Sequence, residues 1–265
     1  QVGDHFGVSV ALSDSGDTAL IGAYVDDVGA NTNQGSAYVY QRSGSVWTEQ
    51  AHLISSDGAT EDYFGRAVAL SSDGNTALIG ADFKVINGNT RHGAAYIFTR
   101  AGAAWSQQTR LTDVNGDAYS WFGASLALSA DGRTALIGTD SSGAIVFTAS
   151  GGIWTQQTFL TDPNAYIGFG KEIAISADGR TALIAAGFTF RRCGNTWLPM
   201  PRLQPDDSPS GFGYAVSLSG DGTIALIGAP FATVGANQKQ GAAYFFPIES
   251  SPCPENSIYL PLILR

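Results

Sequence analysis

An all-β fold is predicted for this 265-residue chain: a five-bladed β-propeller of four-stranded antiparallel blades. One block, in which Phe-Gly precedes a short apolar run, occurs five times, beginning at Phe6, Phe64, Phe122, Phe169 and Phe212. Each block is followed by an Asp-Gly or Ser-Gly turn and a second apolar run, the order expected of antiparallel strands joined by tight turns. A unit of this size cannot bury both faces of its sheet alone, so neighbouring units must cover them.

The elements of a unit follow in a fixed order. The Phe-Gly block supplies the first strand, and the continuously apolar run after the turn, as in residues 76–81, supplies a second strand buried on both faces. An aromatic segment such as 94–98 is the third strand, and a Trp-centred run then follows in four units. These units divide a single domain into blades at about 1–58, 59–116, 117–163, 164–206 and 207–265.

The end of the chain and the closure of the ring leave alternatives open. Residues 257–264 are either the outer strand of the last blade, where Pro261 suits an edge, or a C-terminal sorting or anchoring tail. An open solenoid competes with the ring, but solenoid ends need polar caps and neither terminus resembles one. We therefore expect a closed ring that protects the faces of the first and last blades.

Composition excludes several functions. A net charge of −9 with only 14 Lys and Arg residues argues against a nucleic-acid partner. No apolar run is long enough to be a transmembrane segment. The 33 glycines and the many uncharged polar residues favour a protein outside the cytoplasm. Since the chain begins inside a repeat, we expect that a leader has been removed and that the protein is secreted or at the cell surface.

The repeats resemble the FG-GAP family, known from the propeller of integrin α-subunits and from bacterial surface proteins. The Phe-Gly pairs, the aromatic third strands and the Gly-Ala strand ends at Gly22, Gly80 and Gly228 carry this resemblance over nearly the whole chain. Blades 3 and 4 depart from it, with Gly138-Thr139 and Ala185-Ala186 at the strand ends. The resemblance implies an extracellular adhesion module that binds ligands through one propeller face.

Neither a metal nor a catalytic site is predicted. Some members of this family bind calcium in a turn rich in Asp, but the turns here offer one or two carboxylates each, while calcium needs six to eight oxygen ligands. His5, His52 and His92 occupy different repeat positions, and the sequence lacks the motifs Gly-x-Ser-x-Gly and His-Glu-x-x-His and a phosphate-binding Gly-rich loop before a helix. We predict no cofactor and no enzyme activity. A propeller hydrolase is the disfavoured alternative, since its carboxylates would come from different blades.

The loops that the family topology places on one face are the candidate binding site. They are long in blades 1, 2 and 5 and short in blades 3 and 4, and function commonly resides in such loops. The candidate ligand-binding residues are Asp26, Asp27, Asn31, Asn33, Asp82, Lys84, Asn87, Asn89, Tyr119, Trp121, Tyr166 and Asn237. They predict a non-enzymatic module that recognises a glycan or a cell-surface protein. The alternative is a structural protein that self-associates into a surface layer, sheath or filament.

The tryptophan and cysteine residues carry two further expectations. Trp47, Trp105 and Trp154 each begin a Trp-x-x-Gln segment at the same repeat position, which favours packing between outer strands over a platform for sugars. Cys193 and Cys253 both fall after the third strand of neighbouring units, so a disulfide between them is plausible in geometry, and two lone thiols are the alternative.

Overall fold

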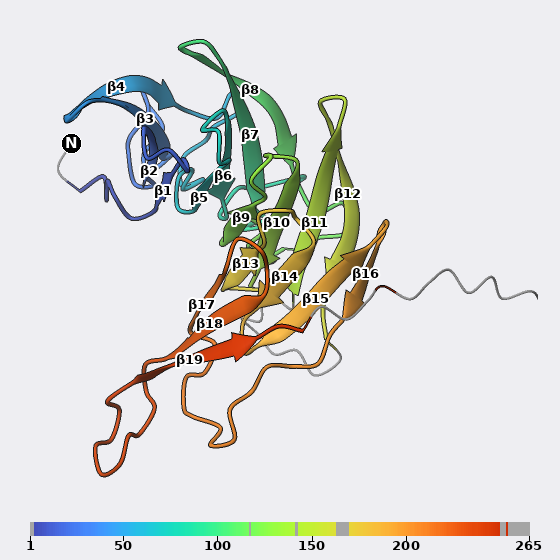
Figure 1. The fold of residues 1–265 in the computed structure, drawn as a ribbon. Helices are drawn as coiled ribbons and strands as arrows, with labels where there is room; N and C mark the ends of the chain where they lie inside the picture. Colours follow the sequence, from blue (N-terminus) through green and yellow to red (C-terminus); the bar gives the residue numbers. More distant parts are fainter. Residues whose placement is uncertain (1–2, 117, 141–142, 163–169, 250–252, 254–265) are drawn as a thin grey trace, which may run out of the picture.

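The computed structural model describes residues 3–116, 118–140, 143–162, 170–249 and 253. It confirms the all-β, five-bladed β-propeller: the described residues form nineteen strands in five antiparallel sheets and no helix (Figure 1). Within this part of the chain, accordingly, no helix is long and apolar enough to cross a membrane.

Each blade is a meander whose strands pair in sequence order. Blade 1 contains β1 (Val10–Leu12), β2 (Thr18–Ala23), β3 (Ser36–Ser43) and β4 (Val46–Leu53). Blade 2 contains β5 (Val68–Leu70), β6 (Thr76–Ala81), β7 (Ala94–Ala101) and β8 (Ala104–Leu111). Blade 3 contains β9 (Leu126–Leu128), β10 (Thr134–Thr139), β11 (Gly143–Ser150) and β12 (Ile153–Leu160).

The last two blades are shorter. Blade 4 contains β13 (Ile173–Ile175), β14 (Thr181–Ile184), β15 (Phe188–Cys193) and β16 (Thr196–Pro199). Blade 5 contains β17 (Ala215–Leu218), β18 (Ile224–Ala229) and β19 (Ala242–Pro247). Residues 257–264, predicted as either its fourth strand or a tail, lie outside the described residues.

The Phe-Gly pair joins one blade to the next. Phe64 and Phe122 are fully buried, and the backbone N–H of Phe64 donates to the carbonyl oxygen of Gln34 at 2.9 Å. The following Gly65 has a φ of +92°, and a Cβ there would lie 2.2 Å from the carbonyl oxygen of Ser36. Only glycine fits that contact, and Gly123, Gly170 and Gly213 lie equally close to backbone atoms of the neighbouring blade.

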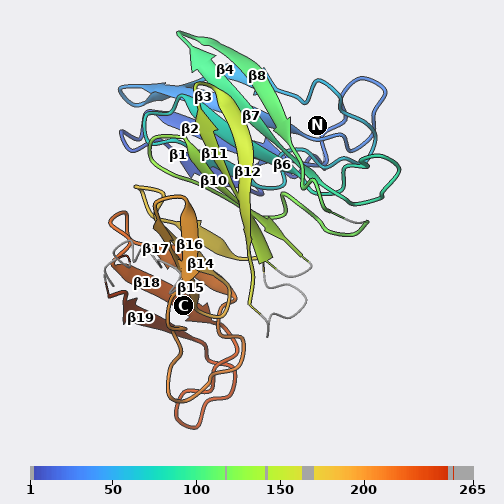
Figure 2. The ribbon, with the colours of Figure 1, turned by 90° about the vertical axis from the view of Figure 1, so that its right-hand side faces the viewer.

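Repeat positions reveal which faces are covered. The third residue of the second strand in each blade points to the following blade. It is fully buried in the first four blades, as Leu20, Leu78, Leu136 and Leu183. The corresponding Leu226 of the last blade is 36% exposed. On the opposite face of the first blade, Val10 is 67% exposed. Figures 1 and 2 show the first and last blades apart, with the other three between them. These two faces are exposed, contrary to the expectation that ring closure protects them.

The outer-strand tryptophans are likewise covered where they lie between two blades. Trp105 packs against the apolar cluster between blades 1 and 2, and its Nε1 donates to Oε1 of Gln50 at 3.0 Å. Trp154 packs between blades 2 and 3 in the same way, so the predicted core role holds for both. Trp47 of blade 1 is 42% exposed.

A disulfide joins the last two blades. Cys193 at the end of β15 is bonded to Cys253, which follows β19, with their Cα atoms 5.5 Å apart. Of the two alternatives predicted from the sequence, a disulfide or two lone thiols, the structure contains the disulfide. A disulfide is consistent with a protein that folds in an oxidising compartment.

Candidate functional site

The loops of the propeller divide between two faces. The β2–β3 type loops and the connectors between blades lie on one face, here called the loop face, and the two kinds of tight turn lie on the other, the turn face. Among the described residues, every non-glycine residue with a left-handed backbone lies on the loop face: His5, Asn33, Glu61, Tyr63, Asn87, Arg91, Tyr119, Trp121, Ala186, Ser208 and Lys239. Such conformations are costly and concentrate at functional sites, so the loop face is the candidate.

Four aromatic side chains form a continuous row across the loop face of blades 1 and 2. Ring centroids are 5.5 Å apart between Tyr24 and Tyr63, 4.6 Å between Tyr63 and Phe83, and 4.6 Å between Phe83 and Trp121. All three contacts are edge-to-face, the arrangement that aromatic pairs favour. These four residues, called the aromatic row, come from two loops and two connectors.

Two arginines interleave with the aromatic row. The guanidinium carbon of Arg91 lies 4.7 Å from the centre of the Phe83 ring and 5.0 Å from that of Trp121. That of Arg66 lies 5.6 Å from the Phe83 ring and 5.8 Å from the Tyr24 ring. Both arginines are exposed, and the guanidinium group of Arg91 makes no hydrogen bond or ion pair with the described residues. Its donors are held in place by ring contacts and are available to a ligand.

A buried carboxylate lies beside this cluster. Asp82 is fully buried, and neither of its carboxylate oxygens accepts a hydrogen bond from the described residues. Burial raises the pKa of Asp82 to about 6, although the charge of Arg66, whose Nε is 3.5 Å from Oδ2, opposes the rise. Asp140, which forms an ion pair with Lys171 at 3.1 Å, adds to the rise.

Two of the predicted ligand-binding residues have internal partners. Asp26 is buried and accepts hydrogen bonds from Ser36 at 2.5 Å and from Tyr38 at 3.1 Å. Lys84 is 5% exposed, and its Nζ lies 2.7 Å from a carboxylate oxygen of Asp62. Both side chains hold loops against the blades.

The asparagines and Asp27 mostly shape their own loops. Asn31 donates to Gln34 at 2.7 Å, and Asn237 donates to Gln240 in the corresponding loop of blade 5 at 3.1 Å. Asp27 accepts from the backbone N–H of Asn33 at 2.8 Å, and Asn33 and Asn87 both have a left-handed backbone. Asn89 exchanges backbone hydrogen bonds with Ile86. These contacts leave the side chains in separate loops.

The structure brings two predicted residues into the cluster. Trp121 belongs to the aromatic row, and Tyr119, which is 59% exposed, lies with its ring centre 5.9 Å from the guanidinium carbon of Arg91. Tyr166 lies outside the described residues. Five residues of the cluster were not predicted from the sequence: Arg66, Arg91, Tyr24, Tyr63 and Phe83. Tyr63 could have been found, because it shares with Trp121 the position just before Phe-Gly.

Carboxylates of the tight turns have internal partners on the turn face. The hydroxyl of Ser71 donates to Oδ1 of Asp73 at 2.6 Å, and the corresponding bond occurs at Asp131, Asp178 and Asp221. Across the part of the chain that the structure describes, no group of three or more His, Cys, Asp and Glu side chains could hold a metal ion.

Comparison with known proteins agrees with this architecture. The model of the FG-GAP repeat family matches residues 1–40, 47–98 and 200–246, more than half of the chain. No curated protein matches the sequence significantly. Among solved structures, the periplasmic gluconolactonase PpgL of Pseudomonas aeruginosa is similar in fold, with a TM-score of 0.56 at 16% identity. The similarity covers 83% of this chain but only 64% of the gluconolactonase. The chain belongs to the FG-GAP repeat family, because the family model matches more than half of it and it contains five Phe-Gly repeats and propeller blades.

Proposed function

We propose that this protein is a non-enzymatic recognition module that binds a glycan outside the cytoplasm, through the aromatic row and the two arginines on its loop face. The observation that carries the proposal is the placement of Arg91, an exposed guanidinium held among three aromatic rings and without a polar partner among the described residues. Aromatic faces stack on sugar rings, and free N–H donors bind sugar hydroxyls or acidic groups.

The backbone supports this proposal. Tyr63, Arg91, Tyr119 and Trp121 all have φ values between 53° and 65°. Each such residue costs about 1 kcal/mol or more in a left-handed conformation, and four of them surround one group of rings. That cost is reasonable where the strained backbone presents side chains to a ligand. The extracellular location is part of the proposal, and the disulfide supports it.

Among the described residues, the buried Asp82 favours a hydrolase, because a carboxyl group with a pKa of about 6 is suited to proton transfer. Against catalysis, Asp82 is fully buried, while a general base must come within hydrogen-bond reach of its substrate. The likeness to a gluconolactonase at 16% identity concerns the fold alone. Hydrolysis of gluconolactone above the uncatalysed rate, abolished by Asp82→Asn, would establish the hydrolase instead.

Self-assembly is a second candidate, favoured by the exposed apolar faces of the first and last blades. Val10 and Leu12 on one face and Leu226 and Phe245 on the other are between 36% and 73% exposed. These faces differ from each other, so copies would associate head to tail. Light scattering that gives a monomer mass at high protein concentration would remove this candidate.

A glycan array tests the main proposal, with Trp121→Ala as the test variant and Trp47→Ala as its matched control. Both replace a tryptophan that is at least partly exposed, but Trp47 lies on the outer strand of blade 1, away from the aromatic row. We expect wild type and Trp47→Ala to bind the same glycans and Trp121→Ala to lose them. An array with no bound glycan, or equal binding by both variants, would contradict the proposal. Capture of a cell-surface protein in place of a glycan would mean that the ligand of the loop face is that protein.

A further inference from the structure

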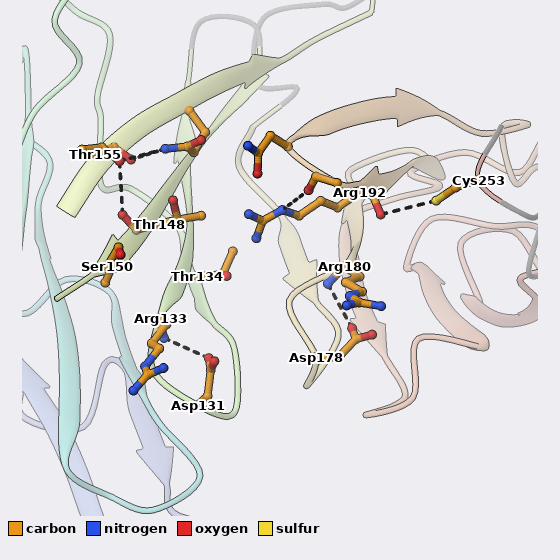
Figure 3. A pocket seen from close by; sticks show the side chains of 14 residues that line it. Asp131, Arg133, Thr134, Thr148, Ser150, Thr155, Asp178, Arg180, Arg192 and Cys253 are labelled. Carbon is orange, nitrogen blue, oxygen red and sulfur yellow. Dashed lines mark hydrogen bonds between the residues drawn. The ribbon is translucent and has the colours of Figure 1, made fainter. Parts of the chain in front are cut away.

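A polar groove of about 740 Å³ lies on the turn face between blades 3 and 4, away from the loop face (Figure 3). Three arginines line it: Arg133 of blade 3, and Arg180 and Arg192 of blade 4. The whole chain has only 14 Lys and Arg residues and a net charge of −9, so three guanidinium groups around one groove are a local exception.

Comparison of repeat positions shows why the charge gathers there. In blade 1, Nε of Arg42 donates to Oδ1 of Asp17 at 3.1 Å, and in blade 2, Nε of Arg100 donates to Oδ1 of Asn75 at 2.9 Å. In blade 4, Arg192 occupies the position of these arginines, but the residue that should accept from it is Arg180.

The backbone confirms that the two arginines are neighbours. The N–H of Arg192 donates to the carbonyl oxygen of Arg180 at 2.7 Å, as that of Arg100 does to Asn75 at 2.9 Å. Blade 4 therefore carries two like charges where blades 1 and 2 carry a donor and an acceptor. Like charges on neighbouring residues repel each other, and an anion bound beside them offsets that repulsion.

Among the described residues, the neighbouring blade does not supply an acceptor for Arg192 either. In blade 2, Nη1 of Arg100 reaches across to Oε1 of Gln41 in blade 1 at 2.8 Å. In blade 3 the shorter Thr148 replaces that glutamine, and Arg192 donates from Nε to the carbonyl oxygen of Gly194 at 3.0 Å. In Figure 3 the side chain of Arg192 points from blade 4 toward the blade 3 strands that carry Thr134 and Thr148.

We propose that this groove binds a sulfate or phosphate group, either as the free ion or as an ester on a larger molecule. The terminal nitrogens of Arg192 and the side chains of Arg133 and Arg180 make no hydrogen bond or ion pair with the described residues, so their donors suit tetrahedral oxyanions. The hydroxyl groups of Thr134 and Thr148 add polar contacts from the other wall.

Two carboxylates also line the groove and reduce its charge without cancelling it. Asp131 accepts from Ser129 at 2.6 Å and Asp178 accepts from Ser176 at 2.6 Å, and each also accepts from a backbone N–H of its own turn. Three guanidinium groups against two such carboxylates leave an excess of positive charge.

Calorimetric titration of the whole chain tests the proposal, with sodium sulfate, sodium phosphate, dextran sulfate and uncharged dextran as probes at constant ionic strength. We expect saturable binding of at least one anionic probe and none of dextran. Arg192→Gln should weaken binding about tenfold or more, the factor that loss of one charge-assisted hydrogen bond produces. Arg42→Gln, a matched substitution at the same repeat position in blade 1, where the arginine is paired with Asp17, should leave the affinity unchanged.

Arg180→Asn is a second variant, and its effect on anion binding should not come from damage to the fold. It restores the acceptor that blade 2 has at this position, so it should weaken anion binding while leaving the melting temperature unchanged or higher. Binding of dextran sulfate but not of the free ions would identify an ester as the ligand. Absence of saturable binding to every anionic probe, or equal affinities for wild type, Arg180→Asn and Arg192→Gln, would overturn the proposal, and neither result bears on the loop face.

Discussion

Replacing Leu78 and Leu226 separately by alanine changes the same repeat position in blades 2 and 5. Leu78 is fully buried between blades 2 and 3, packed in one apolar cluster with Ile97 and Ile137. Its replacement removes buried methyl groups and leaves a cavity, which typically costs about 2–5 kcal/mol of unfolding free energy. Leu226 is already 36% exposed, so its loss should cost about 1 kcal/mol or less.

Urea unfolding, followed by tryptophan fluorescence and by circular dichroism, measures this difference. Both probes are needed because a chain of stacked blades can unfold in more than one step, and the free energies are comparable only where the two transitions coincide. The variants should differ by at least about 1 kcal/mol, with similar dependence on urea. If Leu226→Ala loses as much as Leu78→Ala, then the face of the last blade is covered in solution and our description of it is wrong.

Three further predictions concern two buried charged groups and the disulfide. The pKa of Asp82 is about 6 in the folded protein against 3.8 for a free side chain, so the folded state binds the proton more tightly. The free energy of unfolding should therefore fall by as much as about 3 kcal/mol as the pH rises from about 4 to 6. Asp82→Asn should remove this fall, as measured by urea titrations at each pH. Lys84→Met should cost about 3–5 kcal/mol, because it leaves the carboxylate of Asp62 buried without its partner; a loss under 1 kcal/mol in urea unfolding would contradict the ion pair. Reduction of the Cys193–Cys253 disulfide should lower the free energy of unfolding by about 2–4 kcal/mol, measured with and without reductant, and an unchanged value would mean that the bond does not constrain the chain.

Much of the fold could be predicted because the chain repeats itself. At Phe64 and Phe122 the phenylalanine fills the space between two blades, and the glycine after it allows backbone to approach backbone, so the repeated pair marked the blades. Closure of the ring could not be predicted in this way. Internal blades bury both faces whatever lies at the ends, and Leu226 has the same sequence surroundings as the fully buried Leu78.

The candidate site was predictable only in its location. Loop length pointed to the loop face, but polarity alone did not separate a ligand-binding Asp or Lys from one that holds a loop, and Asp26 and Lys84 proved to have partners inside the fold. The cluster around Arg91 was missed because its members come from separate loops and connectors. The groove between blades 3 and 4 did leave a signal: Arg180 and Arg192 stand at positions where other blades pair an arginine with an acceptor.

The most direct test of the central claim is amide hydrogen exchange of the whole protein with and without the glycan that binds best on the array. We predict slower exchange in the connectors and loops that carry Tyr63, Phe83, Arg91 and Trp121, with no change in the turns of the opposite face. Protection confined to the turn face, or to the exposed sheets of the first and last blades, would contradict it.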